Sequence, residues 1–483
     1  MKKSLLWLVI VLLSVSIVTV FSLAGCKTEK EETVQTEEVT AEEVAPDEEE
    51  VENAEVVPTE ELSEMEKAIE DGKKYAGSTI NVMVSGDVAL STLEGISQDF
   101  EDATGVNVEL SIVGWDVLLQ QVPISLTSGA SEWDVVDLWE PWIDTFGSTD
   151  ALVDLRDYMS VELELIAPQI RDLVAIGDYV PGFVLMPSWE IMFYNKDLVE
   201  AVGLDPEDPP ETMDEFYEWV KELSLDTDND GSIDRYALIM DFTVDWGYIA
   251  YQHFHKAFNG IPFEIVDGKT NVTFDTPEME EAINYLKKLY DEGYMAPGVL
   301  TEFQWDVTSM YSNEEIPLLQ MWDMYSAYLD EAVVDKTGFF AFPGKEKGTY
   351  AGTAGHEILG IPSSSSNIEA AKAYIKYACS YENTKMRALV DGASPLYEED
   401  WENPEIISAM PWLVEVEKAK AFETPRVFPV ENCNELLIYT MSKIHEVLLG
   451  TITTEECLED IQAYADTFET LDTALGKYSI YMK

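Results

Sequence analysis

The chain has 483 residues, of which 46% are hydrophobic, and a formal net charge of −65 at pH 7. Its length allows two domains with large cores, and its 12 Trp and 23 Tyr indicate that most of the sequence is globular. The strongly acidic charge argues against nucleic acids and polyanionic sugars as partners, and we interpret it as a solvated acidic surface.

The N-terminal residues have the pattern of a targeting segment. Lys2 and Lys3 precede an apolar run that ends in the sequence LAGC at residues 23–26, and this order of basic and apolar residues is typical of a secretory signal peptide. The LAGC ending resembles a bacterial lipobox, which implies a signal peptide over residues 1–25 and a lipidated Cys26. The alternative is a single transmembrane anchor, because the apolar run is long.

Residues 26–76 are rich in Glu, Thr, Val, Ala and Pro and almost free of aromatic side chains. A segment of this composition buries too little apolar surface to fold. We therefore predict a disordered acidic tether with a reach of roughly 40 Å, which would link the lipid on Cys26 to a folded domain.

The first folded region alternates predicted strands and helices. Strands are expected over 78–85, 106–112 and 135–138, and helices over 90–103, before Gly105, and over about 115–126. This order predicts an open, mostly parallel sheet. Ligands in such sheets bind beyond the carboxyl ends of the strands, which here lie at 85–87 and 139–142.

The stretch 179–216 marks the passage to a second structural unit. It opens with an extended segment around Pro187 and Trp189, and then residues 193–198 predict a short turn of helix that stops near Gly203. After a proline-rich loop, Thr212 and Glu215 have the spacing of a helix capping box.

This order of signals resembles the family 1 extracellular solute-binding proteins, the sugar-binding subunits of bacterial ABC importers related to maltose-binding protein. The matching residues are YNKDL at 194–198, Gly203-Leu204 and PPETMDEF at 209–216, with Met213 where the family usually has Trp. The resemblance spans roughly residues 77–470 and implies an α/β, two-lobed periplasmic-binding-protein-like fold. Each lobe would be a mostly parallel sheet flanked by helices, and a hinge would join the two.

The resemblance also sets the expected domain boundaries. Lobe 1 is expected at 77–188, lobe 2 at 189–355, a return to lobe 1 at 356–400, and C-terminal helices at 401–483 mainly on lobe 2.

A cleft for neutral sugars needs flat apolar faces for the ring and charged acceptors for the hydroxyls. The predicted passages between the lobes and the ends of the predicted strands supply both aromatic and acidic candidates, although each Trp could also be a core residue. The candidate ligand-binding residues are Asp87, Trp139, Glu140, Trp142, Trp189, Asp245, Trp246, Trp322, Asp323, Glu357 and Arg426.

A second candidate site is an acidic loop in lobe 2. Asp226, Asp228, Asp230 and Asp234, with Gly231, copy positions 1, 3, 5, 9 and 6 of a calcium loop. Position 12 is Ala, so a further ligand would come from elsewhere, and a polar surface turn is the alternative. The only cofactor expected is therefore a structural Ca²⁺.

Catalysis is the competing class of function. Glu140 and Glu190 could in principle hydrolyse a glycoside, but the sequence has no GxSxG, Walker A or dinucleotide-binding motif. His253 and His255 are expected to be packing or surface residues. We therefore expect no enzyme activity, and an ATPase on a separate chain.

The resulting hypothesis is an extracytoplasmic, lipid-anchored, monomeric binding protein on a bacterial membrane. It would close on a mono- or oligosaccharide by hinge bending and deliver it to an ABC permease. The alternative ligands are polyamines or other small solutes, which would suit an acidic, Trp-lined cleft. Beyond Cys26, the remaining Cys379, Cys433 and Cys457 are expected to be mainly buried thiols.

Overall fold

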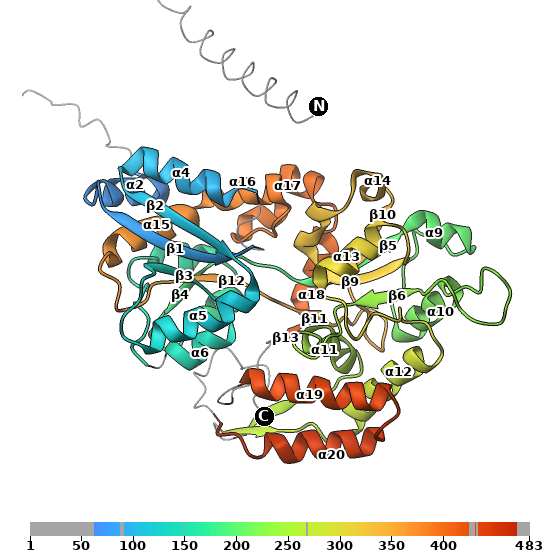
Figure 1. Ribbon diagram of the computed structural model, residues 1–483. Coiled ribbons are helices and arrows are strands. Elements are labelled where there is room, and N and C mark those ends of the chain that lie inside the picture. Colours follow the sequence, from blue (N-terminus) through green and yellow to red (C-terminus); the bar gives the residue numbers. More distant parts are fainter. Residues whose placement is uncertain are drawn as a thin grey trace, which may run out of the picture. The chain divides into compact units, whose positions relative to one another are not determined.

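The computed structural model describes residues 62–86, 91–147, 149–266, 269–424, 430 and 433–470, and Figure 1 shows their arrangement. The expected signal peptide, Cys26, most of the expected tether, Asp87 and Arg426 lie outside the described residues. Within the described ranges, every helix is too short or too polar to cross a membrane.

Lobe 1 is built on a five-stranded sheet with the order β2-β1-β3-β12-β4. Strand β1 pairs in parallel with β2 and β3, whereas β12 is antiparallel to both β3 and β4. Four strands therefore run in one direction and β12 in the other. Their bounds are β1 Thr79–Ser85, β2 Asn107–Val113, β3 Val135–Leu138, β4 Gly182–Met186 and β12 Glu357–Gly360.

The helices of lobe 1 cover both faces of this sheet. Strand β2 lies on one side of β1 and β3 on the other, so the connections from β1 to β2 and from β2 to β3 cross the sheet in opposite directions. Because both crossovers are right-handed, they place α4 and α5 on opposite faces of the sheet (Figure 1). Helices α2, α4 and α15 pack against one another. The bounds are α2 Glu64–Lys73, α4 Leu93–Thr104, α5 Trp115–Thr127, α6 Pro141–Gly147, α7 Ser160–Leu165, α8 Pro168–Val174, α15 Ile368–Ala378 and α16 Tyr381–Asp391.

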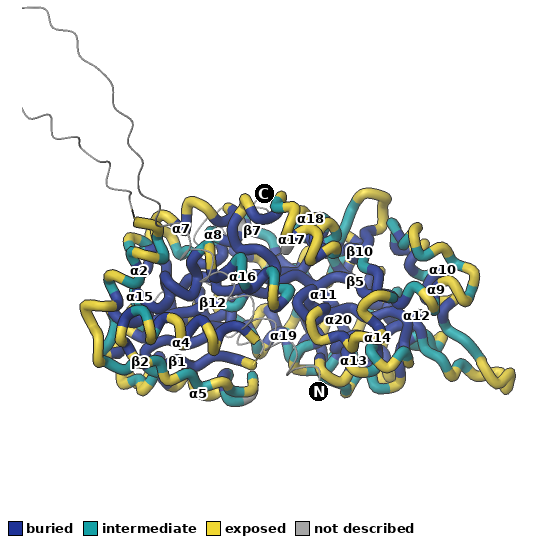
Figure 2. The backbone as a smooth tube through the Cα atoms, turned by 90° about the horizontal axis from the view of Figure 1, so that it is seen from above, coloured by how far each residue is buried: buried dark blue, intermediate teal, exposed yellow. Residues whose placement is uncertain are grey.

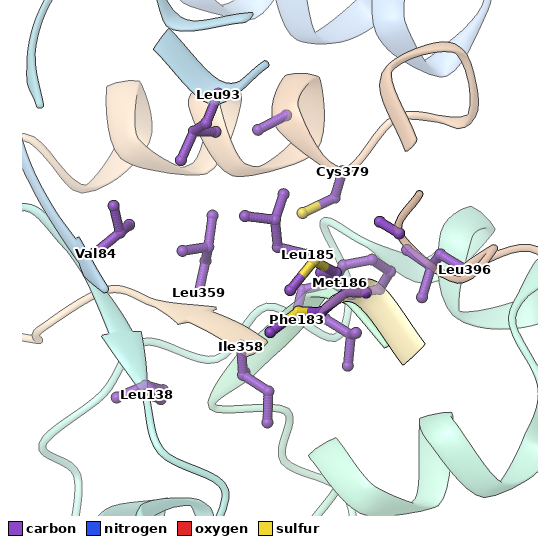
Figure 3. Close-up of a cluster of buried hydrophobic side chains, with 14 of the residues drawn as sticks. Val84, Leu93, Leu138, Phe183, Leu185, Met186, Ile358, Leu359, Cys379 and Leu396 are labelled. Carbon is purple, nitrogen blue, oxygen red and sulfur yellow. The ribbon is translucent and has the colours of Figure 1, made fainter. Parts of the chain in front are cut away.

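The core of lobe 1 fills both sides of the sheet. In Figure 3, Leu359 and Val84 point toward the helices that carry Leu93 and Cys379, whereas Ile358 points to the opposite side. All of these side chains are buried. The sheet is therefore sandwiched between helices: β3 and β4 are buried along their whole length, whereas the edge strand β2 is only partly buried.

Lobe 2 is built on a four-stranded sheet with the order β10-β5-β9-β6. Strand β5 is antiparallel to β10 and β9, whereas β6 is parallel to β9. The strands are β5 Glu190–Asn195, β6 Leu238–Met240, β9 Leu318–Trp322 and β10 Thr337–Phe340, and β7 Phe263–Val266 pairs with β8 Lys269–Val272 in a separate hairpin.

The helices of lobe 2 include a C-terminal pair. Helices α19 and α20 pack against each other and against α12, below the second sheet in Figure 1. The bounds are α9 Lys196–Ala201, α10 Met213–Leu223, α11 Tyr248–Ala257, α12 Pro277–Asp291, α13 Gln304–Ser312, α14 Glu331–Val334, α18 Leu413–Ala421, α19 Cys433–Leu448 and α20 Thr454–Ala465, with the 3₁₀ helix η1 Asp323–Tyr328. Helix α17 Pro404–Ala409 packs on the 3₁₀ helix η2 Glu398–Glu402 and on α16 of lobe 1. Buried residues run through the interior of both lobes, and exposed residues gather on outer loops and helices (Figure 2).

The chain passes between the lobes three times: the first two passages are the short segments 187–189 and 354–356, which we call the hinge, and the third follows α16. The first joins β4 to β5, and the second leads from β11 (Gly352–Thr353, paired with β13 Glu423–Thr424) to β12. The two segments also pair with each other: Trp189 and Ala354 form an antiparallel bridge, and the Gly355 N–H donates to the Ser188 carbonyl at 2.9 Å. The strands β5 and β12 that follow the crossings are the two that run against their own sheets.

Local signals explain several boundaries. Helix α4 ends at Gly105, whose φ of 77° is easily adopted only by glycine. Thr212 caps α10 by accepting from the Glu215 N–H, but the Glu215 carboxylate accepts from the Glu211 N–H and not from Thr212. The predicted helical turn at 193–198 was wrong in its first half, because residues 193–195 end β5 and Asn195 caps α9.

The predicted end of the tether at residue 76 was also wrong. Helix α2 begins with a capping box formed by Ser63 and Glu66, and it packs on α15 and α4. The Lys376 ammonium joins Glu64 to the buried Glu162 at 2.5 and 2.9 Å. Met65, Ala68 and Ile69 supply the apolar stripe of this helix, which the acidic composition of the segment concealed.

Candidate functional site

A cavity of about 650 Å³ lies between the lobes, and we call it the outer cavity. From lobe 1 it is lined by residues at and just beyond the carboxyl ends of β1, β2 and β3 and by the first turns of α5, the position expected for a ligand in an α/β sheet. From lobe 2 it is lined by loops and by α19. The lining residues are Gly86, Ile112, Val113, Gly114, Trp115, Leu119, Trp139, Asp245, Trp246, Phe303, Trp305, Asn434 and Ile438.

Aromatic rings from both lobes meet at this cavity. The Trp246 ring of lobe 2 lies 5.6 Å from the Trp115 ring and 6.1 Å from the Trp139 ring of lobe 1, between centroids, at angles of 64° and 68°. Trp246 also contacts Phe303 at 6.4 Å. Edge-to-face pairs of this kind are favourable beyond the area they bury, so the lobes contact each other directly through indoles.

A second, much smaller cavity of about 20 Å³ lies on the hinge side, and we call it the inner pocket. Trp115 and Trp246 line both cavities. The inner pocket is lined by Trp115, Ser188, Trp246, Ile249, Gln304, Trp322, Met324, Gly355 and Glu357.

The charge of the outer cavity is modest. Among the lining residues that the structure describes, Asp245 carries the only charge, and Lys and Arg are absent. Asn434 adds one amide. These described side chains suit a neutral or cationic ligand better than an anionic one.

The ligand-binding residues predicted from the sequence lie in different parts of the structure. Trp139, Asp245 and Trp246 line the outer cavity, and Trp322 and Glu357 line the inner pocket. Glu140 and Trp142 line neither cavity; both are buried beside Trp139, with the Trp142 ring 6.1 Å from the Trp139 ring. Trp189 and Asp323 lie at the hinge. Asp87 and Arg426 lie outside the described residues, and ligand contact by all of these side chains stays a prediction.

Sequence reasoning missed several lining residues. Trp115 lies two residues past the end of β2, so the rule for carboxyl strand ends could have identified it. Phe303 and Trp305 lie at the start of α13, which follows helix α12, and Asn434 lies on α19, which follows only the two-residue strand β13. The sequence offers no comparable signal for these three residues.

Asp323, for which ligand contact stays a prediction, joins segments of the hinge through hydrogen bonds. Its fully buried carboxylate accepts from the Ser188 hydroxyl at 2.7 Å and from the Trp189 N–H at 3.0 Å. It also accepts from the hydroxyl of Ser394, which follows α16 of lobe 1. Burial raises the pKa of Asp323 to about 6, because desolvation of the charged form outweighs these hydrogen bonds.

A second buried network joins α11 to the strands β5, β9 and β11 beside the hinge. The Gln320 amide donates to the Glu190 carboxylate at 3.0 Å and lies 2.9 Å from Nδ1 of His253. His253 is also within 3.4 Å of the Thr353 hydroxyl on β11. Burial lowers the pKa of His253 to about 4. These residues therefore have structural partners, and neither Glu190 nor Glu140 lines the outer cavity or the inner pocket.

The acidic loop gathers three of its four predicted carboxylates. Oxygen atoms of Asp226, Asp228 and Asp234 lie within 4.8 Å of one another. The carboxylate of Asp230 accepts from the Ser232 N–H at 2.8 Å. Three hard oxygen donors are chemically suited to Ca²⁺, but exposed acidic turns also form without a cation, so calcium binding stays a prediction.

The described cysteines are buried, as predicted from the sequence. Cys379 and Cys457 are free and buried, and burial raises the pKa of both thiols. Cys433 is buried as well.

Comparisons with known proteins place these features in context. A family model described as bacterial extracellular solute-binding protein matches residues 85–385. A probable amino-acid ABC transporter periplasmic-binding protein of Sinorhizobium fredii, y4oP, is 23% identical over 421 residues, which are 82% of this chain and 90% of that protein.

Solved structures share the two-lobed fold. T. maritima MalE3 with maltose bound superposes with a TM-score of 0.71 at 22% identity, over 81% of this chain and 99% of that one. A solute-binding protein of Thermotoga lettingae with tagatose bound gives 0.72 at 20% identity, over 81% and 99%. At these identities the likeness establishes the fold.

Proposed function

Because the chain belongs to the bacterial extracellular solute-binding protein family of ABC importers, we propose that its solute is a carbohydrate, a mono- or oligosaccharide. The protein would bind the sugar between its lobes and deliver it, chemically unchanged, to the permease. The observation that carries this proposal is the cluster of Trp115, Trp139 and Trp246 at the outer cavity.

The cavity supports a sugar through its size and its faces. A volume of about 650 Å³ is within the usual range for small-molecule sites. Indole faces suit the C–H side of a pyranose ring, and Asp245 offers a charged acceptor for hydroxyl groups. Because the aromatic side chains come from both lobes, a sugar between them would link ligand binding to hinge closure.

Amino acids are a weaker candidate, although the relative y4oP carries that name. An α-amino acid presents a carboxylate as well as an ammonium group. The described lining offers Asp245 for the ammonium group but no Lys or Arg for the carboxylate.

Polyamines remain the second candidate, and Asp245 beside Trp246 is the observation that favours them. A carboxylate next to indole faces attracts an alkylammonium group through charge and cation–π contact. A long polyamine carries several such groups, however, and the described lining supplies one acid.

The proposal also covers where this protein is located and which partners it has. A lipid on Cys26 would anchor the protein on the outer side of a bacterial membrane, and the acidic segment would act as a tether up to α2. The folded chain would work as a monomer with permease subunits and a separate ATPase chain. The secretory segment and the LAGC sequence at 23–26 support this proposal.

A thermal-shift screen tests the ligand class. The mature chain with Cys26→Ser would be heated with mono- and oligosaccharides, amino acids and spermidine. A ligand at 100 times its Kd adds about 2.7 kcal/mol, which shifts the Tm of a protein of this size by a few degrees. We expect a shift with a neutral sugar that is recovered intact; a shift with spermidine or amino acids alone, or a cleaved sugar, would contradict the proposal.

A further inference from the structure

Helices α19 and α20 bring the last described residues close to the outer cavity. The two helices lie side by side (Figure 1), and a short connection joins them, so the end of α20 lies beside the start of α19. The Tyr464 hydroxyl donates to the Glu435 carboxylate at 2.5 Å, and Thr470 forms an antiparallel bridge with Val430. Asn434, on the first turn of α19, lines the outer cavity. The chain beyond Thr470 therefore starts near this cavity.

Residues 471–483 follow Thr470 and lie outside the described residues, and we call them the tail. An extended chain spans roughly 3.3–3.6 Å per residue, so the tail can cover about 40 Å. By the same rule the path from Val430 to Asn434 is at most about 14 Å, and paired strands lie about 5 Å apart. The tail is therefore long enough to enter the outer cavity.

The side of the outer cavity that lobe 2 supplies is apolar and partly exposed. Four of its six residues have apolar or aromatic side chains: Trp305 is 42% exposed, and the other three are half-buried. Partly exposed apolar side chains that gather in one place mark an interaction site. Because α19 and α20 belong to the same lobe, contact with the tail requires no particular hinge angle. We call these six residues the lobe 2 wall: Asp245, Trp246, Phe303, Trp305, Asn434 and Ile438.

The tail has a composition that suits this wall. Residues 476–483, with the sequence GKYSIYMK, combine two Tyr, one Ile and one Met with two Lys and no acid. The whole chain, by contrast, has 94 acidic and 29 basic residues. The apolar side chains fit the aromatic part of the wall, and a Lys ammonium fits the Asp245 carboxylate and the indole faces beside it.

We propose that the tail occupies the outer cavity when no solute is bound. Tyr478 and Tyr481 pack against the lobe 2 wall, and a tail Lys pairs with Asp245. A cavity of about 650 Å³ is the size of a small-molecule site, so the tail and a solute exclude each other. The competition rests on the proposed function, whereas docking of the tail does not.

Fluorine NMR tests the docking without any solute. The mature chain with Cys26→Ser would be labelled with 5-fluorotryptophan, and the signals of the two wall indoles assigned with Trp246→Phe and Trp305→Phe. We expect both signals to move when the chain is truncated after Thr470. The synthetic peptide GKYSIYMK, added to the truncated chain, should move them back.

Three controls separate docking from other effects of truncation. The full-length double variant Tyr478→Ser, Tyr481→Ser should move the wall signals in the same direction as truncation, whereas Thr473→Ala, outside residues 476–483, should leave them in place. The signal of Trp219 on α10, which lines neither the outer cavity nor the inner pocket, should not move in any of these chains.

Two NMR results would overturn the docking. The first is a pair of wall signals that stay in place both on truncation and in the double tyrosine variant. The second is a difference between the full-length and truncated chains that vanishes on dilution, because the tail would then bind a second copy of the chain.

Titration calorimetry with the sugars that raise the Tm tests the competition. If the tail occupies the cavity in about two-thirds of the molecules, truncation strengthens the apparent affinity about threefold. Equal affinities for the full-length and truncated chains would overturn the competition. If no sugar binds either chain, the proposed function fails, and the NMR result still decides whether the tail docks.

Discussion

Asp323→Asn tests the burial of the hinge carboxylate. The carboxylate is fully buried and accepts from Ser188, Trp189 and Ser394. Burial raises its pKa from the ordinary value of 3.8 to about 6. The substitution keeps the shape of the side chain and removes its titration, so a comparison with the unchanged protein isolates the contribution of this one group.

The sign of the effect follows from proton binding. Between about pH 4 and pH 6 the folded chain retains a proton on Asp323 that the unfolded chain has lost, so the contribution of Asp323 to stability is largest below pH 4 and falls as the pH rises toward 6. The gap between the two pKa values corresponds to about 3 kcal/mol in total. Of this, about 2 kcal/mol is lost between pH 4.8 and 7.5, a range that stays above the isoelectric point of about 4.1.

Urea unfolding, followed by Trp fluorescence over that pH range, measures this difference. The free energy of unfolding of the unchanged protein minus that of Asp323→Asn should fall by about 2 kcal/mol from pH 4.8 to 7.5. Asp335→Asn, at an exposed position, controls for the amide substitution itself. A difference that stays constant across the range would refute the argument that desolvation dominates at this carboxylate.

Four further predictions concern separate parts of the chain. Asp245→Ala should weaken sugar binding by about tenfold, or about 1.4 kcal/mol, in titration calorimetry, because a charge-assisted hydrogen bond is lost; unchanged affinity would exclude Asp245 from the site. Thr212→Ala should lower the free energy of unfolding by about 1 kcal/mol through loss of the α10 cap, and an unchanged urea midpoint would contradict this. Millimolar Ca²⁺ should raise the Tm, and Asp228→Asn should abolish the rise; a rise that persists in the variant would place the ion elsewhere. Cys26→Ser should move the protein from the membrane fraction to the soluble fraction, and continued membrane retention would argue for a transmembrane anchor.

Much of the fold could be predicted because its signals are local. Gly105, Thr212 and Thr276 mark helix ends through backbone conformation or side-chain caps, and such features need only a few neighbouring residues. The family resemblance was confirmed by the match over residues 85–385 and by the shared two-lobed fold. Helix α2 was missed because its short apolar stripe lies in a segment with a strongly acidic average.

The site was harder to predict because it depends on non-local contacts. Asp323 has partners 135 and 71 residues away in the sequence, and no local pattern distinguishes such an acid from one that faces a ligand. Trp139 and Trp246 were predicted by the positions of strand ends and crossings, and they do line the outer cavity. Phe303 and Trp305 reach the cavity from a segment whose sequence carries no such signal.

The crystal structure of the protein with its sugar would test the central claim most directly. The account predicts an intact sugar between the lobes in the outer cavity, in contact with the cluster of Trp115, Trp139 and Trp246 and with a hydrogen bond to Asp245. A sugar bound outside the outer cavity, or a solute other than a sugar in it, would contradict the account.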